Sequence, residues 1–445
     1  MKKELIVIFI IGLIFCQSKA IATVIGETEF VTDSITDKIV IAPVPTVNND
    51  PTTEAFLKAL KKLSIKTYGV VNYYNYDWQT DPDRRNAVNL ERINTYMKYD
   101  FTDKIQLKTE FEIENGGTGA TMELDKFEEF GEYEAEIEAG GEVLLEQLNI
   151  AFKIKPWLQI RAGRLKIYMG VSSELDLPVS YFTGHRSNME NTILPLGWYE
   201  VGIEASGDLG AKKKWSYKAY LVNGLSSAGF SSANWIQRGH QKRFEMANAE
   251  NLAVAARLDY NLANNGWVGV SGYYGNTNDN RPKPDLERVN GYVSVYDVHA
   301  NLNYKAFKLR GMLLYGHLQN SGLISEANRN LSNNLNVKRS PVGSDVLGFF
   351  VESGYDVLNL TNIEDKQLYV FGRYDFYDTM FKVAEGVFDN PRWERSEITF
   401  GINYFPHPDV VLKSHYAVRT LGLSTDNIEN TFLLGIGFTF KTLNY

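Results

Sequence analysis

The sequence is poor in cysteine and proline and has no long apolar run after its N-terminus. Its 445 residues include one cysteine and 13 prolines, against 36 glycines and 26 tyrosines. No later segment supplies the roughly 20 apolar residues that a transmembrane helix requires. The formal net charge of −8 argues against a nucleic-acid partner. The abundance of glycine and tyrosine favours a chain built from many strands.

The N-terminus has the three-part pattern of a secretory signal peptide. Two lysines at positions 2 and 3 precede an apolar stretch over 5–15 and a small-residue motif at 20–22. We therefore predict a signal peptide over residues 1–22. A lipoprotein would use Cys16, but the bulky Phe15 stands where a small residue is needed. Removal of residues 1–22 takes away the only cysteine, which excludes disulfides, thiolate metal sites and cysteine nucleophiles.

Motifs of catalysis and of cofactor binding are absent from the sequence. The six histidines show no HExxH spacing, and there is no GxSxG nucleophile elbow. Gly435-Ile436-Gly437 lacks the third glycine and the following helix of a dinucleotide fingerprint. We expect no enzyme activity, no cofactor and no bound metal.

Apolar and polar residues alternate along most of the chain, as in strands with two different faces. In residues 105–113 the odd positions hold Ile, Leu, Thr, Phe and Ile, and the even positions hold Gln, Lys, Glu and Glu. The same pattern predicts sixteen strands, with cores near 65–76, 91–100, 104–114, 144–154, 158–167, 198–206, 215–223, 253–260, 267–275, 292–304, 307–316, 347–356, 368–376, 396–404, 410–419 and 431–440.

Short and long gaps alternate between these runs. Short gaps follow the second, fourth, tenth and fourteenth runs. The long gaps are 115–143, 168–197, 224–252, 276–291, 317–346 and 377–395. Outer-membrane barrels have short periplasmic turns and long external loops, and a closed barrel leaves no backbone group unpaired in lipid. We therefore predict an all-β transmembrane antiparallel barrel of about 16 strands, with a secreted soluble β protein as the alternative.

The predicted barrel covers residues 64–445. The preceding residues 23–63 are polar and proline-containing, and we assign them to a periplasmic N-terminal segment with a short helix over 55–63. Aromatic girdles are typical of both membrane interfaces. Trp157, Trp215 and Trp267 each stand at the start of a strand after a short turn, where such a girdle is expected.

Several segments together resemble the phosphate-selective porin (porin O/P) family of outer-membrane channels. They are LNIAFKIKPWLQIRAGRLKIYMG (148–170), YEVGIEASGDLG (199–210), WSYKAYLVNG (215–224), YVFGRYDFYD (369–378) and FGINYFPHPDVVLKSHY (400–416). The resemblance covers about residues 65–440 and implies a sixteen-stranded barrel, commonly trimeric, with loops folded inward to narrow the pore. The family usually continues its GxxK motif with a proline-containing stretch, whereas this chain has Ile167-Tyr168-Met169-Gly170.

Charged strand residues should face the lumen, because a charge on the lipid face costs about 2–4 kcal/mol at the midplane. Among the acidic residues the alternation selects Glu110, Glu112, Glu200, Glu204, Asp259, Glu352 and Asp375. Among the basic residues it selects Lys108, Arg161, Lys218, Arg257, Lys308, Arg310, Arg373, Lys413 and Arg419. Arg164 and Lys166 join this set only if Gly163 forms a bulge, which glycine in a strand often marks.

Anion passage requires positive charge where a pore is narrow, and the planar guanidinium matches phosphate oxygens. By the resemblance and by spacing, Arg161, Arg164 and Lys166 are the best anion-binding candidates, with Arg186 in the following loop. Alternatively these groups pair with lumen carboxylates and stiffen the wall. The acidic stretch 123–138 is expected to be a solvated surface or a divalent-cation bridge to lipopolysaccharide.

The expected function is passive diffusion of small hydrophilic solutes, with phosphate or other anions as the selective case. The alternatives are a general porin and a non-conducting barrel that acts as an adhesin or envelope anchor. The expected partners are outer-membrane lipid, lipopolysaccharide, the solute and two further copies in a homotrimer.

Overall fold

In a computed structural model of the chain, residues 58–125, 134–195, 197–241, 247–331, 339–361, 363 and 365–442 are described, with backbone alone at 118–125, 134–142, 211 and 264. The chain divides into two units, Met1–Lys61 and Lys62–Tyr445. In the first unit residues 58–60 are helical, within the short helix expected at 55–63. The signal peptide predicted at 1–22 and residues 23–57 lie outside the described part, as does Tyr445.

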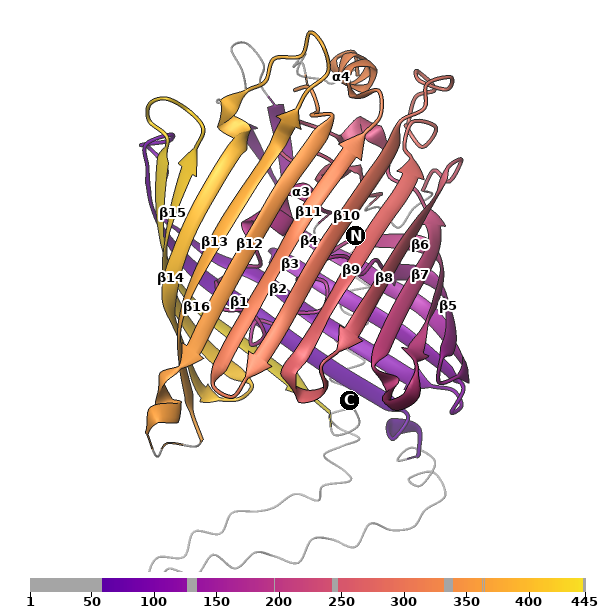
Figure 1. Cartoon of the computed structure of the whole chain (residues 1–445), viewed down its shortest axis with the longest axis vertical. Coiled ribbons are helices and arrows are strands. Elements are labelled where there is room, and N and C mark those ends of the chain that lie inside the picture. The colour runs from indigo at the N-terminus through magenta and orange to yellow at the C-terminus, as the bar shows by residue number, and fades with distance from the viewer. Residues whose placement is uncertain are drawn as a thin grey trace, which may run out of the picture. The chain divides into compact units, whose positions relative to one another are not determined.

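The second unit is a closed barrel of sixteen strands in which every pair of neighbours is antiparallel and β1 pairs with β16 (Figure 1). This confirms the predicted fold class. The strands are β1 (Leu63–Trp78), β2 (Ala87–Asp100), β3 (Ile105–Asp125), β4 (Glu134–Lys155), β5 (Leu158–Lys166), β6 (Tyr199–Leu209), β7 (Trp215–Asn223), β8 (Leu252–Asn261), β9 (Gly266–Asn276), β10 (Tyr292–Tyr304), β11 (Phe307–Leu318), β12 (Asp345–Asp356), β13 (Gln367–Lys382), β14 (Glu394–His407), β15 (Val410–Leu421) and β16 (Ile428–Lys441).

The helices are short and lie in the connections between strands. In the described residues no helix has the length and apolar character needed to cross a bilayer. They are α3 (Asn188–Ile193), α4 (Ser321–Arg329) and the 3₁₀ turns η1 (Ala211–Lys213), η2 (Ser227–Gly229), η3 (Gln237–Gly239), η4 (Ala263–Asn265), η5 (Val357–Leu360) and η6 (Pro391–Trp393).

The connections gather by length at the two ends of the barrel. One end carries tight turns such as Pro156-Trp157 and Lys305-Ala306, and the other carries the long loops and α4 (Figure 1). We call these the turn end and the loop end. The long gap predicted at 115–143 is wrong for most of its length, because β3 and β4 continue to Asp125 and from Glu134. The glycines at 116 and 117 hid this continuation from a pattern that counts apolar residues.

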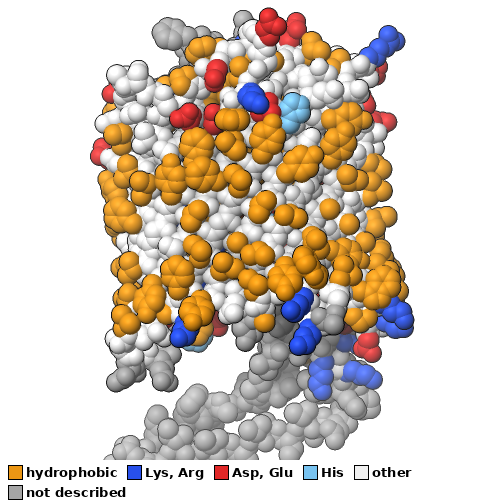
Figure 2. Space-filling model, viewed as in Figure 1, with side chains coloured by type: hydrophobic (Ala, Val, Ile, Leu, Met, Phe, Trp, Pro, Cys, Tyr) orange, Lys and Arg blue, Asp and Glu red, His pale blue; other side chains and the backbone are white. Residues whose placement is uncertain are grey.

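The outer face of the barrel is apolar between its two ends. Val254, Val298 and Ile398 are among the large apolar side chains that are at least half exposed on this face. On the side shown in Figure 2, lysine, arginine, aspartate and glutamate gather at the ends and the wall between them carries apolar and uncharged groups. Such a belt is what the hydrocarbon layer requires of a barrel.

Two of the three tryptophans predicted for the girdle lie on the outer surface, and the third does not. Trp157 and Trp215 are exposed. Trp267 instead faces the lumen, where the Arg257 guanidinium lies 4.9 Å from its ring centroid and the His299 ring lies 5.2 Å away. The expectation for Trp267 is therefore wrong, because a buried arginine offered its ring a cation–π contact that an outward ring could not make.

The interior is not polar throughout, contrary to the simple expectation of a charge-lined lumen. Val293 and Val295 of β10 are buried while their neighbours Tyr296 and Val298 are exposed, so the apolar inner positions face the lumen. They belong to one apolar cluster that also includes Met189 and Ile193 of α3 and Trp235, Ile236 and Phe230 of the β7–β8 loop. Loops thus fill part of the barrel with a hydrophobic core.

Candidate functional site: the lumen and its inserted loop

The β5–β6 connection, residues 167–198, folds into the barrel and is the main element of the site. We call it the inserted loop. Its helix α3 lies within the barrel (Figure 1), and Met189 and Ile193 of α3 are fully buried. Gly348 of β12 makes this possible, since a Cβ there would lie 2.6 Å from the Met189 side chain. The predicted inward-folded loop is therefore present despite the missing proline motif.

Phe182 anchors the inserted loop to the wall by apolar contact. Its ring stacks on Phe371 at 5.2 Å between centroids and lies tilted to Tyr369 at 5.3 Å. Gly354 of β12 leaves the space for this ring, because a Cβ at that position would lie 2.4 Å from Phe182. Burial of an aromatic ring in such a pocket fixes the loop tip against β12 and β13.

Polar side chains of β14 and β15 hold the backbone around Phe182. The Lys413 ammonium donates to the carbonyls of Tyr181 (2.7 Å) and Thr183 (2.8 Å). Asn403 Nδ2 donates to the Phe182 carbonyl (2.8 Å), and the Gly184 amide donates to His415 Nε2 (3.0 Å). These bonds satisfy backbone groups that would otherwise be buried without partners, so they fix one loop conformation.

Arg373 is the centre of a second anchor, made of charges. It lies against three carboxylates, at 2.6 Å from Asp375, 3.7 Å from Glu352 and 3.8 Å from Glu397, and its side chain is 2% exposed. Its Nη1 also donates to Thr183 Oγ1 of the inserted loop (2.6 Å). Asp375 in turn accepts from Ser187 Oγ at the start of α3 (2.7 Å). One buried ion cluster thus ties the wall to the loop.

A third anchor lies on β8, where Arg257 reaches the start of the inserted loop. Its Nη1 donates to the Gly170 carbonyl (2.6 Å), and its Nε donates to Asp259 (2.7 Å). Asp259 also faces His299 Nε2 (2.9 Å), and His299 Nδ1 faces Asp297. The loop is therefore fixed to β8 as well as to β13, β14 and β15.

Charged groups of both signs concentrate where the inserted loop faces β1–β6. A cavity of about 30 Å³ lies there, lined by Tyr68, Arg92, Glu112, Glu114, Leu144, Glu146, Arg164, Arg186, Gly197, Tyr199 and His240. This volume holds roughly two water molecules. We call this group the charged wall. Its three arginines and three glutamates make it a site of mixed charge.

β-Bulges occur in β2 and in β4, the two strands that flank β3, and the bulge in β4 adds a carboxylate to this wall. Glu110 pairs with Gln147 and Phe111 with Leu145, so Glu146 is an extra residue in β4. Val70 pairs with Arg92 and Val71 with Leu90, so Glu91 is an extra residue in β2. A bulge turns two consecutive side chains to one face, and both Glu146 and Gln147 are buried.

Gly163 breaks the alternation of β5 in a different way. Its φ of +128° lies in a region that favours glycine, and the strand continues without a register shift beside Asn149 and Gly202. Arg164 is buried after this kink, with its Nε donating to the Glu146 carbonyl (3.1 Å). The condition stated for Arg164, a bulge at Gly163, is therefore not met, yet the side chain is buried inside the barrel.

We expect Gly163→Ala to destabilise the barrel by about 1–3 kcal/mol, because it combines an unfavourable φ with a clash. An added Cβ would lie 2.3 Å from the Leu148 carbonyl oxygen. Urea unfolding in detergent micelles measures the effect. Gly372→Ala is the matched control, since a Cβ there meets no atom closer than 3.9 Å; equal unfolding midpoints for the two variants would contradict the assignment.

The four anion-binding candidates lie inside the barrel, and carboxylate partners among the described residues are seen for Arg161, Lys166 and Arg186. Arg161 Nη1 lies 3.5 Å from Glu204. Asp176 of the inserted loop accepts from both Lys166 (2.8 Å) and Arg186. These contacts agree with the alternative that the basic groups pair with lumen carboxylates and stiffen the wall. Contact of these residues with a solute stays a prediction.

The other basic candidates also lie inside the barrel and fall into three groups. Arg257, Arg373 and Lys413 are the loop anchors described above. Lys218 pairs with Glu174 of the inserted loop, Arg310 with Glu352 and Arg419 with Glu429. Lys108 and Lys308 each lie over a tyrosine ring, Tyr96 at 5.7 Å and Tyr369 at 4.5 Å. Most of these groups therefore stiffen the barrel.

The alternation missed Arg92, Glu146 and Asp176. A signal for the first two was present, since Leu90-Glu91-Arg92-Ile93 and Leu145-Glu146-Gln147-Leu148 each hold two polar residues between two apolar ones. That pattern is typical of a bulge in an otherwise alternating strand. Asp176 lies in a loop, where no periodicity indicates which side chain returns to the wall.

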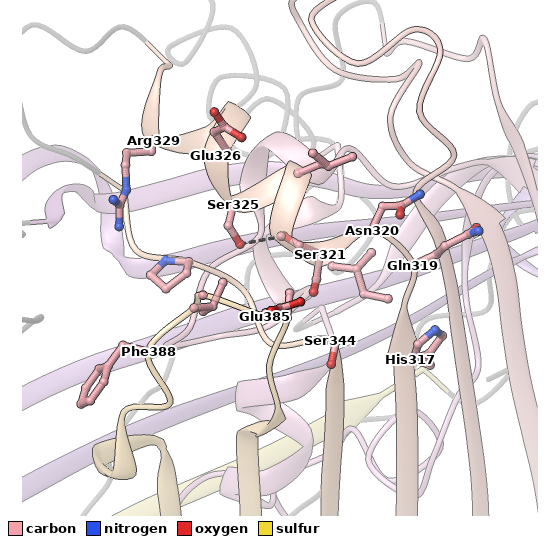
Figure 3. A pocket seen from close by; sticks show the side chains of 17 residues that line it. His317, Gln319, Asn320, Ser321, Ser325, Glu326, Arg329, Ser344, Glu385 and Phe388 are labelled. Atoms are coloured by element: carbon pink, nitrogen blue, oxygen red, sulfur yellow. Dashed lines mark hydrogen bonds between the residues drawn. The ribbon is translucent and has the colours of Figure 1, made fainter.

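A larger cavity of about 760 Å³ lies at the loop end, between α4 and residues 384–388. Figure 3 shows Glu385 and Phe388 on one side and Gln319, Asn320 and Ser321 on the other, with Ser325 donating to the Ser321 carbonyl (2.7 Å). The groove is built from the rim and does not include the inserted loop. We therefore take the lumen as the candidate site.

Comparison with known proteins agrees with the fold and gives no family name. No family model matches the chain. An uncharacterized protein of Aquifex aeolicus (strain VF5) is 29% identical over 385 residues, which cover 85% of this chain and 80% of that protein. OmpF of Salmonella typhi, solved with daunomycin, superimposes with a TM-score of 0.51 at 13% identity, over 85% of this chain and 97% of that one.

The outer-membrane channel DcaP of Acinetobacter baumannii has a TM-score of 0.50 at 11% identity, over 85% of this chain and 96% of that one. Both solved structures are similar in fold alone. The closed sixteen-stranded barrel with its apolar belt defines the class, which is that of transmembrane antiparallel β-barrels.

Proposed function

We propose that this protein is an outer-membrane channel through which small hydrophilic solutes diffuse passively. The observation that carries the proposal is the inserted loop, which is fixed inside a closed barrel and faces a wall of mixed charge. A polar, narrowed lumen passes water-soluble molecules of limited size without any reaction. OmpF and DcaP, the latter titled an outer membrane channel, support the proposal by fold.

The pairing of charges favours a channel that accepts solutes of either sign. Lys166 and Arg186 share Asp176, and Arg92 lies 3.2 Å from Glu112. Paired charges present little net field to an ion at a distance. A general porin is therefore the form of the proposal that the geometry supports best.

Preference for phosphate or other anions is the second form, and it also accounts for the sequence resemblance. One observation favours it: Lys98 and Lys108 are paired residues on β2 and β3, and Lys108 has only a ring contact in the described residues. Reversal potentials in a potassium chloride gradient separate the two forms. Clear anion preference supports the second, and equal permeabilities support the first.

Conductance in planar bilayers tests the proposal itself. Purified protein should insert and give stepwise currents, because a continuous aqueous path must run between the inserted loop and the wall. A barrel that inserts but passes no current would instead support the adhesin or anchor alternative. Native mass spectrometry of the same detergent sample tests the homotrimer, and fractionation of cells tests association with outer-membrane lipid and lipopolysaccharide.

A further inference from the structure

We propose that Glu146 forms a binding position for a small monovalent cation, either an alkali ion or the ammonium group of a solute, in the charged wall. The inference rests on the proposed channel function and adds a residue that determines which ions pause in the lumen.

The register of β4 against β3 turns Glu146 toward the lumen. Regular alternation would place only every second side chain of this strand on the inner face. Because Glu146 is the extra residue of the bulge opposite Glu110 and Phe111, it joins Gln147 on the lumen side. Bulges re-aim side chains next to functional sites, so the distortion of β4 itself brings this carboxylate to the cavity.

The Glu146 side chain is buried. Glu146 is 7% exposed, and it lines the cavity between β1–β6 and the inserted loop. A buried carboxylate is costly unless it meets a donor or a cation. Within the described residues, no hydrogen bond or ion pair reaches the Glu146 carboxylate.

The three arginines around Glu146 already have other acceptors. Arg92 lies 3.2 Å from Glu112 and Arg186 is paired with Asp176. Arg164 directs its Nε to the carbonyl of Glu146 and Nη1 to the carbonyl of Gln241. Since each guanidinium already has an acceptor, the charge without a partner in this wall is negative, and a cation completes it.

The size of the cavity limits the ligand. About 30 Å³ accommodates a partly dehydrated alkali ion or a single ammonium head group and excludes a larger cationic group. Carbonyl and carboxylate oxygens suit both ligands. Chloride and phosphate would instead meet the carboxylate of Glu146, while the three arginines of the wall already have acceptors.

The test compares Glu146→Gln with Glu114→Gln, which removes the same charge from the same cavity at a more exposed position. We measure single-channel conductance and reversal potential in potassium chloride and in methylammonium chloride. In the native protein, conductance should saturate with cation concentration. Glu146→Gln should abolish saturation and lower the cation-to-anion permeability ratio about tenfold, as expected for loss of a nearby charge in a poorly solvated site. Glu114→Gln should keep saturation and change the ratio much less.

The outcomes separate the two ligand sources and the two proposals. Saturation in both salts identifies a general small-cation site, and saturation in methylammonium alone identifies an ammonium site. Equal effects of the two variants, or a Glu146→Gln channel identical to the native one, overturn the proposal.

If the protein conducts no current, the channel function fails and the cation site is tested by stability. A cation that binds only the folded barrel raises its urea midpoint. This shift should occur in the native protein and be lost in Glu146→Gln. Absence of the shift in the native protein would overturn the site.

Discussion

Replacement of Arg373 by methionine is expected to destabilise the barrel by about 3–5 kcal/mol, the usual cost of removing one partner from a buried ion cluster. Asp375 and Glu397 would keep their negative charges with no cation in contact, while Glu352 would retain Arg310 at 2.9 Å. The bond from Arg373 to Thr183 would also be lost. Urea unfolding in detergent, followed by tryptophan fluorescence, measures the change.

The same substitution is expected to make single-channel current larger and noisier, because the inserted loop loses a connection to β13. Lys213→Met is the control. Lys213 is paired with Asp208 at 3.6 Å, but its side chain is 68% exposed, so its loss should cost less than about 1 kcal/mol. If both variants unfold at the same urea concentration, the ion cluster does not stabilise the barrel as the geometry indicates.

Asp176→Asn is expected to shift the channel toward anions by about tenfold in permeability ratio, since it leaves two cations in the lumen without their shared carboxylate. Asp176 accepts from Lys166 and Arg186 and also from the Tyr96 hydroxyl. An amide of the same shape keeps an acceptor for these donors, so the loop should stay in place. Reversal potential in a potassium chloride gradient is the measurement.

Asp81→Asn serves as the control for Asp176→Asn. Asp81 lies in the β1–β2 loop, pairs with Arg84 at 4.0 Å and is 33% exposed, so its charge is screened by solvent. Its substitution should leave the reversal potential close to that of the native channel. An unchanged potential in Asp176→Asn would mean that solutes do not pass near Lys166 and Arg186.

The strands could be predicted from the sequence because each has one face in lipid. Lipid-facing positions accept only apolar residues, as at Val254, Val298 and Ile398, and this constraint is local to each strand. All sixteen predicted strands are present. The continuation of β3 and β4 escaped prediction because it extends beyond the apolar belt, where no such constraint applies.

The inner face was harder to predict because its neighbours come from distant parts of the chain. Val295 faces inward although it is apolar, since Gly316 beside it leaves room for Trp235 of the β7–β8 loop. Trp267 faces inward because Arg257 offers its ring a partner. Neither contact can be recognised from a periodic pattern in the sequence, because its partners lie on different strands or loops. For most basic residues the inward direction was predictable, but their partners were not.

The inward direction of Glu146 was partly predictable from the sequence. The bulge that turns it inward leaves a local trace, the two polar residues between Leu145 and Leu148. The trace indicates a break in register but does not show which strand bears the extra residue, because that depends on the partner β3. The chemistry of the cavity became apparent only when Arg164 and Arg186 were placed beside it.

Because β1 pairs with β16, the barrel can close only after its last strand is available. Tyr68 lies opposite Thr439, and the register runs on to Trp78 opposite Glu429, so the seam joins the first and last strands to be synthesised. Until the last strand is exported, both edges of the nascent sheet have open backbone groups that lipid cannot satisfy. A chain that ends before β16 would leave the edge of β1 open, so closure of the barrel has to wait until the last strand is available.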